Sequence, residues 1–349
     1  GLSQYESRLG ISPHGREVLF LIDGFGAQAM DDYTEAMPNI MAGKSFGDIT
    51  TAFPSTTSTS LATLLTGSMP NEHGMLGYTV RVPNSDGRVL NALKWDERVD
   101  PLFWQPKETF FEIGNRNGIN ATHVAAKRYE DTGFTRAVFR GAKYKGANIL
   151  ADLISETVLA LKSSPSFVYL YVNDLDSAGH SDGVGSERWI AALVAIDQLA
   201  AQLLSKVPKG TRLWVTADHG MINVGEKIIL GRDNDLLRDI AVIAGEPRTR
   251  HLYLAEHNPA MVSEVISRWE LTLGSRVAMY SRESAIAAGL FGRKVSLDAA
   301  ERAGDVIAIA QEDVVLLDPE RAEKEGSMVG HHGGDSEIES SVPLLTAQK

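Results

Sequence analysis

Three short apolar runs, each ending in acidic residues, constrain the fold of this chain more than any other feature. They are Val18–Ile22 before Asp23, Phe167–Val172 before the Asn-Asp-Leu-Asp segment 173–176, and Leu213–Thr216 before Ala-Asp-His at 217–219. Continuous apolar runs of this length are typical of strands buried on both faces of a parallel sheet. We therefore expect an α/β fold that brings carboxylates from distant parts of the chain to one edge of a sheet.

Helical patterns separate these expected strands. Ser58–Thr66, Glu187–Lys206 and a segment from about Met261 to Leu273 place apolar residues at helical spacing. Residues 80–150 are expected to form loops and short elements over one sheet edge. The predicted catalytic core comprises 1–245 together with 326–349, and 246–325 form a smaller, cap-like α/β insertion.

The composition narrows the possible functions. The 349 residues include 34 Lys and Arg against 45 Asp and Glu, a formal net charge of −11. This acidic balance argues against nucleic-acid partners, because phosphate backbones are bound by basic surfaces. The chain contains no cysteine, which excludes disulfides, zinc thiolates and a thiol nucleophile. Any metal must therefore be held by oxygen and imidazole nitrogen.

The residues near the start of the given sequence bear on the expected location of the protein in the cell. Val18–Ile22 is far too short to span a membrane, and residues 1–17 are polar, unlike a signal peptide. We expect a cytoplasmic protein, a monomer or homodimer, which takes a small-molecule substrate and has neither nucleic-acid nor membrane partners.

Carboxylates and imidazoles gather at the expected strand ends. His219 directly follows Asp218, and a Gly-His-His-Gly-Gly segment lies at 330–334. His180 follows Asp176 by four residues, which places both side chains on one side of a helical turn. Together with Asp23, these groups are more than one metal needs. They match a two-metal site of the kind used for in-line displacement at phosphorus.

Each motif also has a simpler interpretation. An Asp at a strand end is often only the N-cap of the next helix, and Gly-His-His-Gly-Gly can be a flexible loop. Asp-His-Gly and Asp-x-x-x-His are weak patterns by themselves. Their joint occurrence at expected strand ends favours the metal site.

The segment 51–67 offers a nucleophile. Thr57 immediately precedes the helix expected to begin at Ser58, so its hydroxyl would meet the positive end of the helix dipole and the free N–H of Ser58. Both would stabilise an alkoxide and the oxygens of a bound phosphate. The alternative is that Ser55, Thr56 and Thr57 are only N-cap candidates in a polar turn.

These motifs together resemble the type I phosphodiesterase/nucleotide pyrophosphatase family of the alkaline phosphatase superfamily. The matching segments are LIDGFG (21–26), FPSTTSTSLATLLTGSMPNEHG (53–74), DSAGH (176–180), TADHG (216–220) and GHHGG (330–334). They occur in family order over nearly the whole chain. The resemblance implies an alkaline-phosphatase-like three-layer sandwich: a mostly parallel central sheet, helices on both faces and a smaller α/β insertion.

The resemblance also implies the roles of individual residues. The nucleophile is Thr57, nine residues before the Thr of the Thr66-Gly67 pair. One metal ion would be held by Asp23, Thr57, Asp218 and His219, and a second by Asp176, His180 and His332. His332 is preferred over His331 because the family's ligand directly precedes glycine. Two zinc ions are implied, although manganese or iron would suit the same ligands.

The implied reaction is hydrolysis of a phosphodiester or pyrophosphate bond in a nucleotide-type substrate, through a phosphothreonine intermediate. Ser58 and Tyr78 are the expected substrate-binding residues. Two departures from the family pattern leave the substrate open. Phe53-Pro54 precede Thr57 instead of following it, and Tyr78 stands in place of an Asn that donates to a phosphate oxygen. A phenol can also donate, from a different distance.

Two other functions stay open. A phosphomonoesterase or phosphonate hydrolase on the same scaffold would favour an additional cation for the dianion, and the sequence does not identify one. A metal-stabilised binding protein without turnover would not need a nucleophile beside a full ligand set.

Overall fold

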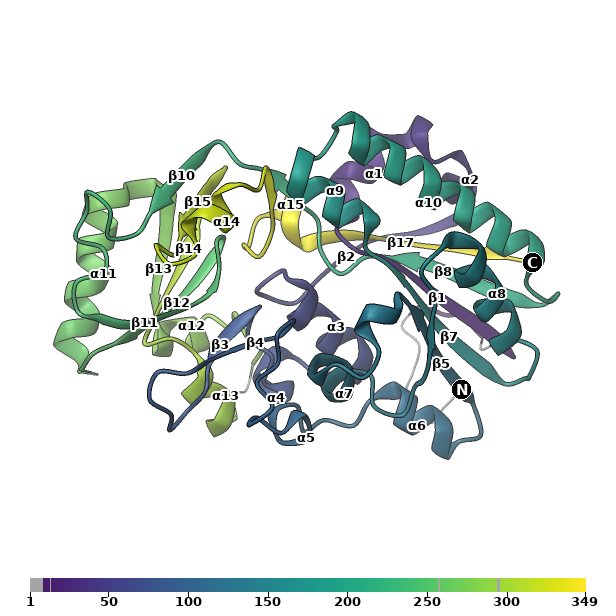
Figure 1. Cartoon of the computed structure of the whole chain (residues 1–349), viewed down its shortest axis with the longest axis horizontal. Coiled ribbons are helices and arrows are strands. Elements are labelled where there is room, and N and C mark those ends of the chain that lie inside the picture. The colour runs from purple at the N-terminus through teal and green to yellow at the C-terminus, as the bar shows by residue number, and fades with distance from the viewer. Residues whose placement is uncertain (1–8, 13, 257, 294–295) are drawn as a thin grey trace.

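The computed structural model describes residues 9–12, 14–256, 258–293 and 296–349. The polar segment 1–17 therefore lies partly outside the described residues. A seven-stranded sheet forms the centre of the molecule, in the order β2-β17-β8-β1-β7-β5-β6 (Figure 1). The pairs β8-β1, β1-β7, β7-β5 and β5-β6 are parallel, whereas β17 runs antiparallel to both β8 and β2. The expected mostly parallel sheet is confirmed.

The three apolar runs form neighbouring central strands. They are β1 (Arg16–Ile22), β7 (Ser166–Val172) and β8 (Thr211–Thr216). Alternate residues of β1 point to opposite faces, so Phe20 and Leu21 enter two different hydrophobic clusters, both fully buried. Because each strand is buried on both faces, it has the continuous apolar sequence of a strand inside an α/β sandwich.

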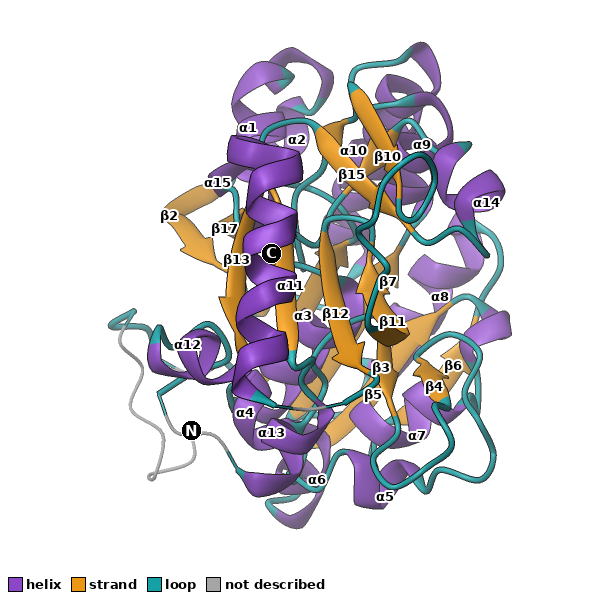
Figure 2. Cartoon of the chain, turned by 90° about the vertical axis from the view of Figure 1, so that its left-hand side faces the viewer, coloured by secondary structure: helices purple, strands orange, loops and turns teal. Residues whose placement is uncertain are grey.

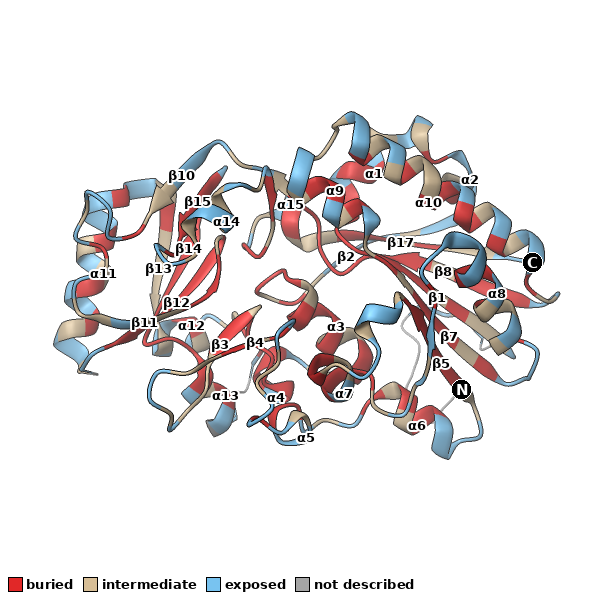
Figure 3. Cartoon of the chain, in the orientation of Figure 1, coloured by how far each residue is buried: buried red, intermediate tan, exposed pale blue. Residues whose placement is uncertain are grey.

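Helices cover both faces of this sheet. One face packs against α8 (Leu150–Ala160) and α10 (Glu187–Lys206). The other packs against α3 (Thr57–Thr66), α6 (Phe110–Arg116) and α7 (Gly133–Val138). Figure 3 shows the resulting pattern, with buried strands between helices whose outer sides are exposed. These three layers confirm the predicted sandwich.

A second, antiparallel sheet lies beside the main one. Its order is β11-β12-β14-β13, with bounds Ile240–Glu246, Thr249–Leu254, Val306–Ala310 and Val277–Ser281. Helix α11 (Pro259–Leu273) crosses one face of it through Val265 and Trp269 (Figure 2). The smaller sheet thus begins at Ile240, inside the range that the sequence assigned to the core. The strand β10 (Glu226–Ile229), from the range predicted as the core, pairs with β15 (Val314–Leu317), from the range predicted as the insertion.

The expectation of loops over residues 80–150 was wrong in part. This range contains β5 (Asn120–Ala125) and β6 (Lys143–Gly146), two strands of the central sheet. The strand β5 has the sequence NATHVA, in which Asn, Thr and His interrupt the apolar run. The strands β2 (Lys44–Thr50) and β17 (Ser341–Gln348), which pair with each other at one side of the sheet, were also missed. The edge strand β2 is mostly exposed and carries polar residues.

The remaining elements are short, apart from α9 (Asp174–Asp182), which begins directly after β7. They are α1 (Ala27–Asp32), α2 (Pro38–Met41), α4 (Pro70–His73), β3 (Thr79–Arg81), β4 (Val89–Asn91), α5 (Pro101–Trp104), β9 (Ile222–Asn223), α12 (Arg282–Ala287), α13 (Leu297–Arg302), α14 (Ala322–Gly326), β16 (Gly330–His331), α15 (Glu337–Ser340) and three 3₁₀ turns at Thr34–Ala36, Lys127–Tyr129 and Gly274–Arg276. Within the described ranges, no helix combines the length and apolarity needed to cross a membrane.

Candidate active site

Four side chains meet where β1 and β8 end and α3 begins. We call Asp23, Thr57, Asp218 and His219 the strand-end cluster. The His219 Nε2 atom lies 3.2 Å from Asp23 Oδ1 and 3.1 Å from Thr57 Oγ1. Asp23, Asp218 and His219 are at most 3% exposed. The helix begins at Thr57, one residue earlier than expected, with Thr56 as its N-cap. The Thr57 hydroxyl therefore projects from the first turn toward the two strand ends.

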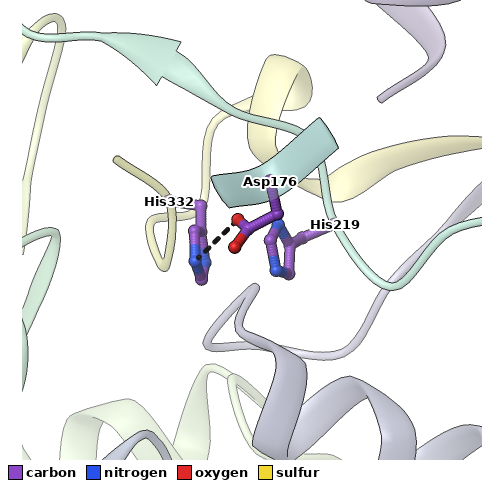
Figure 4. A group of neighbouring side chains, drawn as sticks. All are labelled: Asp176, His219 and His332. Carbon is purple, nitrogen blue, oxygen red and sulfur yellow. Dashed lines mark ion pairs between the residues drawn. The ribbon is translucent and has the colours of Figure 1, made fainter. Parts of the chain in front are cut away.

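Three further side chains lie beside this cluster. We call Asp176, His180 and His332 the helix–loop cluster, because the first two belong to α9 and the third to the loop after β16. The Nε2 atoms of His180 and His332 lie 3.3 Å and 3.8 Å from Asp176 Oδ1. The rings of His219 and His332 stack with centroids 3.5 Å apart, so the two clusters are adjacent (Figure 4).

The three imidazoles share one orientation. Each Nδ1 lies against a backbone carbonyl: that of His219 is 3.0 Å from Gly220 O, that of His180 is 2.8 Å from Gly330 O, and that of His332 is 3.0 Å from Ser55 O. Because a carbonyl only accepts, these contacts assign a proton to each Nδ1 and direct each Nε2 toward the carboxylates. This arrangement is typical of histidines that bind a metal through Nε2.

The carboxylates are strongly desolvated. Burial, followed by repulsion from Asp23, raises the pKa of Asp218 to about 7 and that of Asp176 well above its usual range. Burial alone would lower the pKa of His219, but the facing Asp218, Asp23 and Asp176 outweigh it and raise the value to about 10. Burial, aided by His219 and His180, holds the pKa of His332 well below its ordinary value.

These properties fit a bound cation. Among the described residues, Asp176 Oδ1 and Asp218 Oδ2 are buried and accept no hydrogen bond, which is rare for buried polar atoms. Ligand atoms of Asp23, Asp218 and His219 lie within 4.8 Å of one another, as do those of Asp176, His219 and His332. Imidazole nitrogen and carboxylate oxygen are the donor types that zinc accepts in catalytic sites. His219 belongs to both of these groups of ligand atoms.

The two glycines after His332 have separate structural reasons. Gly333 has φ of +114°, and a Cβ there would lie 2.5 Å from Glu246 Cγ. A Cβ on Gly334 would lie 2.6 Å from Glu339 Oε2. The loop can therefore approach both buried carboxylates only because these positions lack side chains.

The adjacent histidines of this loop face different surroundings. His331 belongs to β16, which pairs with β9, and its Nε2 is buried without a hydrogen-bond partner in the described part of the chain. The carboxylate of Asp176 lies beside the Nε2 atoms of His180 and His332. The structure thus brings His332 toward the carboxylates.

The two expected substrate-binding residues lie at the start of α3 and beyond α4. The Ser58 hydroxyl donates to Gly77 O at 2.9 Å, so its backbone N–H is the group left for an anion, since the first N–H groups of a helix have no intrahelical acceptor. Tyr78 is half-buried, and its own N–H donates to Glu246 Oε2 at 2.7 Å.

Three residues beside the site were not identified from the sequence. The Tyr171 hydroxyl donates to Asp23, and burial raises its pKa so that the phenol stays protonated. Glu246 is buried against the loop after β16. Arg128 donates to Asn173 Oδ1 at 2.9 Å, directly before α9. The only sequence signals were a tyrosine directly before the last residue of an apolar strand and the Lys127-Arg128 pair after β5.

Comparisons with known proteins agree with this geometry. A model of the type I phosphodiesterase/nucleotide pyrophosphatase family matches residues 18–335 of the chain. The chain belongs to this family. Its members are named for the hydrolysis of phosphodiester and pyrophosphate bonds, and the family resemblance found in the sequence is confirmed.

Relatives of this family member are distant and longer. Ectonucleotide pyrophosphatase/phosphodiesterase family member 1 of Mus musculus is 26% identical over 218 residues, which cover 58% of this chain and 24% of that protein. Ectonucleotide pyrophosphatase/phosphodiesterase 2 of Saccharomyces cerevisiae is 27% identical over 245 residues, covering 61% of this chain and 50% of that protein. The matched part is thus half or less of the length of these relatives.

Solved structures show the same fold. Murine ectonucleotide pyrophosphatase/phosphodiesterase 5 has a TM-score of 0.74 at 18% identity, covering 95% of this chain and 87% of that chain. An inactive variant of that murine protein, in complex with AMP, is equally similar, with a TM-score of 0.74. The predicted alkaline-phosphatase-like α/β fold is confirmed.

Proposed function

We propose that this protein is a two-metal phosphohydrolase that cleaves phosphodiester or pyrophosphate bonds in nucleotide-type substrates. The observation that carries the proposal is the convergence of two carboxylate–imidazole groups beside the Thr57 hydroxyl, with the Nε2 atoms of His180, His219 and His332 facing carboxylates. Family membership supports the bond type. The AMP bound to the murine neighbour supports a nucleotide as substrate or product.

Seven residues would hold the metals. The strand-end cluster would bind one ion through Asp23, Thr57, Asp218 and His219, and the helix–loop cluster the other through Asp176, His180 and His332. We propose zinc in both places, and manganese or iron would suit the same donors. Such ions lower the pKa of a hydroxyl and neutralise charge on phosphoryl oxygens.

The protein's own groups would position the reaction. Thr57 Oγ1 attacks phosphorus, the bond to the leaving oxygen breaks, and phosphothreonine forms. Water then cleaves the Thr57–phosphoryl bond and restores the hydroxyl. The N–H groups of Thr57 and Ser58 at the start of α3 would bind the phosphoryl oxygens, because helix N-termini favour anions. The Tyr171 hydroxyl orients Asp23, and the Tyr78 phenol would donate to the substrate.

The test compares three substrates with and without chelator. Hydrolysis of bis-p-nitrophenyl phosphate and of the p-nitrophenyl ester of a nucleoside 5′-monophosphate should exceed hydrolysis of p-nitrophenyl phosphate. Chelation should abolish all activity and zinc should restore it. Absence of metal-dependent turnover on every substrate would leave only a binding role and refute the proposal.

A second candidate, a phosphomonoesterase, is favoured by one observation. Arg128, at the carboxyl end of β5, donates to Asn173 at the N-cap of α9 and so lies at the same sheet edge as Asp176. A guanidinium there could bind the dianion of a monoester. Preference for p-nitrophenyl phosphate would identify this second activity.

A further inference from the structure

We infer that the turn between β11 and β12 positions His332, through a buried Arg248–Glu339 ion pair and the Thr249 hydroxyl. The inference rests on the proposed function, because it concerns how the helix–loop cluster keeps its metal. It assigns a role to the smaller sheet, whose contribution to the site the family resemblance does not explain.

The ion pair is completely enclosed. Arg248 Nε and Nη2 donate to Glu339 Oε1 and Oε2 at 3.1 and 2.9 Å, and both side chains are at most 1% exposed. A third guanidinium nitrogen, Nη1, donates to the carbonyl of Val314. The guanidinium therefore connects the smaller sheet to α15 through a bidentate contact, which fixes the carboxylate in orientation as well as in place.

The oriented carboxylate holds the loop that carries His332. Glu339 Oε1 accepts the N–H of Gly334 at 2.8 Å, and Oε2 accepts the Ser336 hydroxyl at 2.6 Å. An apolar pair of the same volume would fill this space but could not hold the Gly334 N–H. The ion pair thus orients the carboxylate that binds the N–H of Gly334, the second residue after His332.

The same turn holds the neighbouring peptide as well. The Thr249 hydroxyl donates to Gly333 O at 2.6 Å. From the other side, the Ser55 hydroxyl donates to Gly334 O at 2.6 Å, and His332 Nδ1 meets Ser55 O. The two peptides that follow His332 are therefore fixed between the smaller sheet and the segment before Thr57. This leaves the His332 ring one orientation, with Nε2 toward Asp176.

A matched control lies two residues further along β12. Arg250 is equally buried, and its guanidinium is paired with Glu325 and donates to Leu316 O at 2.8 Å. Within the described part of the chain, no hydrogen bond of this guanidinium reaches Gly333 or Gly334. Removing either arginine leaves a carboxylate without its cation, that of buried Glu339 or of half-buried Glu325. Both changes should therefore destabilise the fold. Only the Arg248 change should also free the His332 loop.

The experiment measures zinc affinity and content in the full chain. We expect R248M to bind its weaker zinc about 10- to 100-fold less tightly than wild type, the usual effect of losing a group that orients a ligand. Zinc content should then fall from about two to about one per chain at limiting zinc, as in H332A. R250M should lose a similar amount of thermal stability and keep both ions.

A second variant with a smaller change tests the inference in case R248M does not fold. T249V removes only the hydroxyl that donates to Gly333, and it should weaken the same zinc in the same direction. Wild-type zinc affinity in folded R248M and T249V would overturn the inference, as would an equal zinc loss in R250M. If R248M does not fold, T249V alone decides. A wild-type protein that binds no zinc would instead refute the proposed function itself.

Discussion

The two halves of the site differ in how they are built. The strand-end cluster consists of strand termini and the start of a helix, and its Asp218 and His219 are at most 1% exposed. In the helix–loop cluster the side chains of His180 and Asp176 are 25% and 14% exposed, and His332 lies on a loop held by the smaller sheet. The first cluster is therefore a property of the parallel sheet, whereas the second depends on packing between distant segments. We therefore expect substitutions in the two clusters to differ in their effects on activity and on zinc content.

The largest effect should follow from T57A. Without its oxygen no phosphothreonine can form, and turnover should fall by about 10⁴-fold or more, as when other covalent nucleophiles are removed. The remaining ligands of both clusters are untouched, so the zinc content should stay near two per chain. Steady-state assays with bis-p-nitrophenyl phosphate and metal analysis together check this.

The neighbouring hydroxyl provides the control. Thr56 is the N-cap of α3, and its side chain makes no capping hydrogen bond. T56A should therefore keep most of the activity. If T57A retains more than a few per cent of wild-type turnover while T56A is inactive, the nucleophile has been assigned to the wrong residue.

The next effect should separate the two adjacent histidines. H332A removes a proposed ligand of the helix–loop cluster, so activity should fall by more than about 100-fold, since even outer-shell partners cost about 10- to 100-fold. One zinc should be lost. H331A should keep both ions and most activity, because His180 and His332 lie against Asp176 whereas His331 is paired with β9. Metal content and kcat/KM of the two variants distinguish them, and the reverse order would exchange their roles.

The contrast between the strand-end cluster and the helix–loop cluster also explains which residues could be predicted from the sequence. Asp23, Asp176 and Asp218 were found because buried parallel strands have continuous apolar sequences and end at a common edge. The strand β5 was missed because its polar His123 and Asn120 interrupt that pattern. Tyr171 looked like a core residue of β7. The Arg248–Glu339 pair joins residues 91 positions apart, and no local pattern reports such a contact.

A smaller effect concerns the stability of the metal-free protein. His219, with a pKa raised to about 10, and Glu246, raised by burial to about 8, keep protons in the folded state that the unfolded chain loses near 6.5 and 4.5. Asp176 acts in the same direction. Because the folded state then binds more protons, its stability falls as pH rises from about 7 to about 9.

Zinc should remove most of this dependence, because bound metal replaces protons on Asp176 and His219. Thermal unfolding with chelator should show a midpoint that decreases over this range, and zinc-loaded protein a flatter profile. The buried histidines with lowered pKa, such as His123, are neutral in both states there and do not contribute. A chelated protein whose midpoint rises with pH would contradict the assignment of these protons.

The smallest effect should come from Arg128, which is exposed beside the start of α9. Its guanidinium donates to Asn173 before α9, and its neighbour Tyr129 packs edge-on against Tyr171, which binds Asp23. R128A should lower kcat/KM for p-nitrophenyl phosphate about 5-fold, or about 1 kcal/mol, the value of an exposed charge pair. The diester, with one negative charge fewer, should be affected less, and R128K should recover part of the loss. Equal losses on both substrates would mean that Arg128 supports the start of α9 and does not contact the second charge of the phosphate.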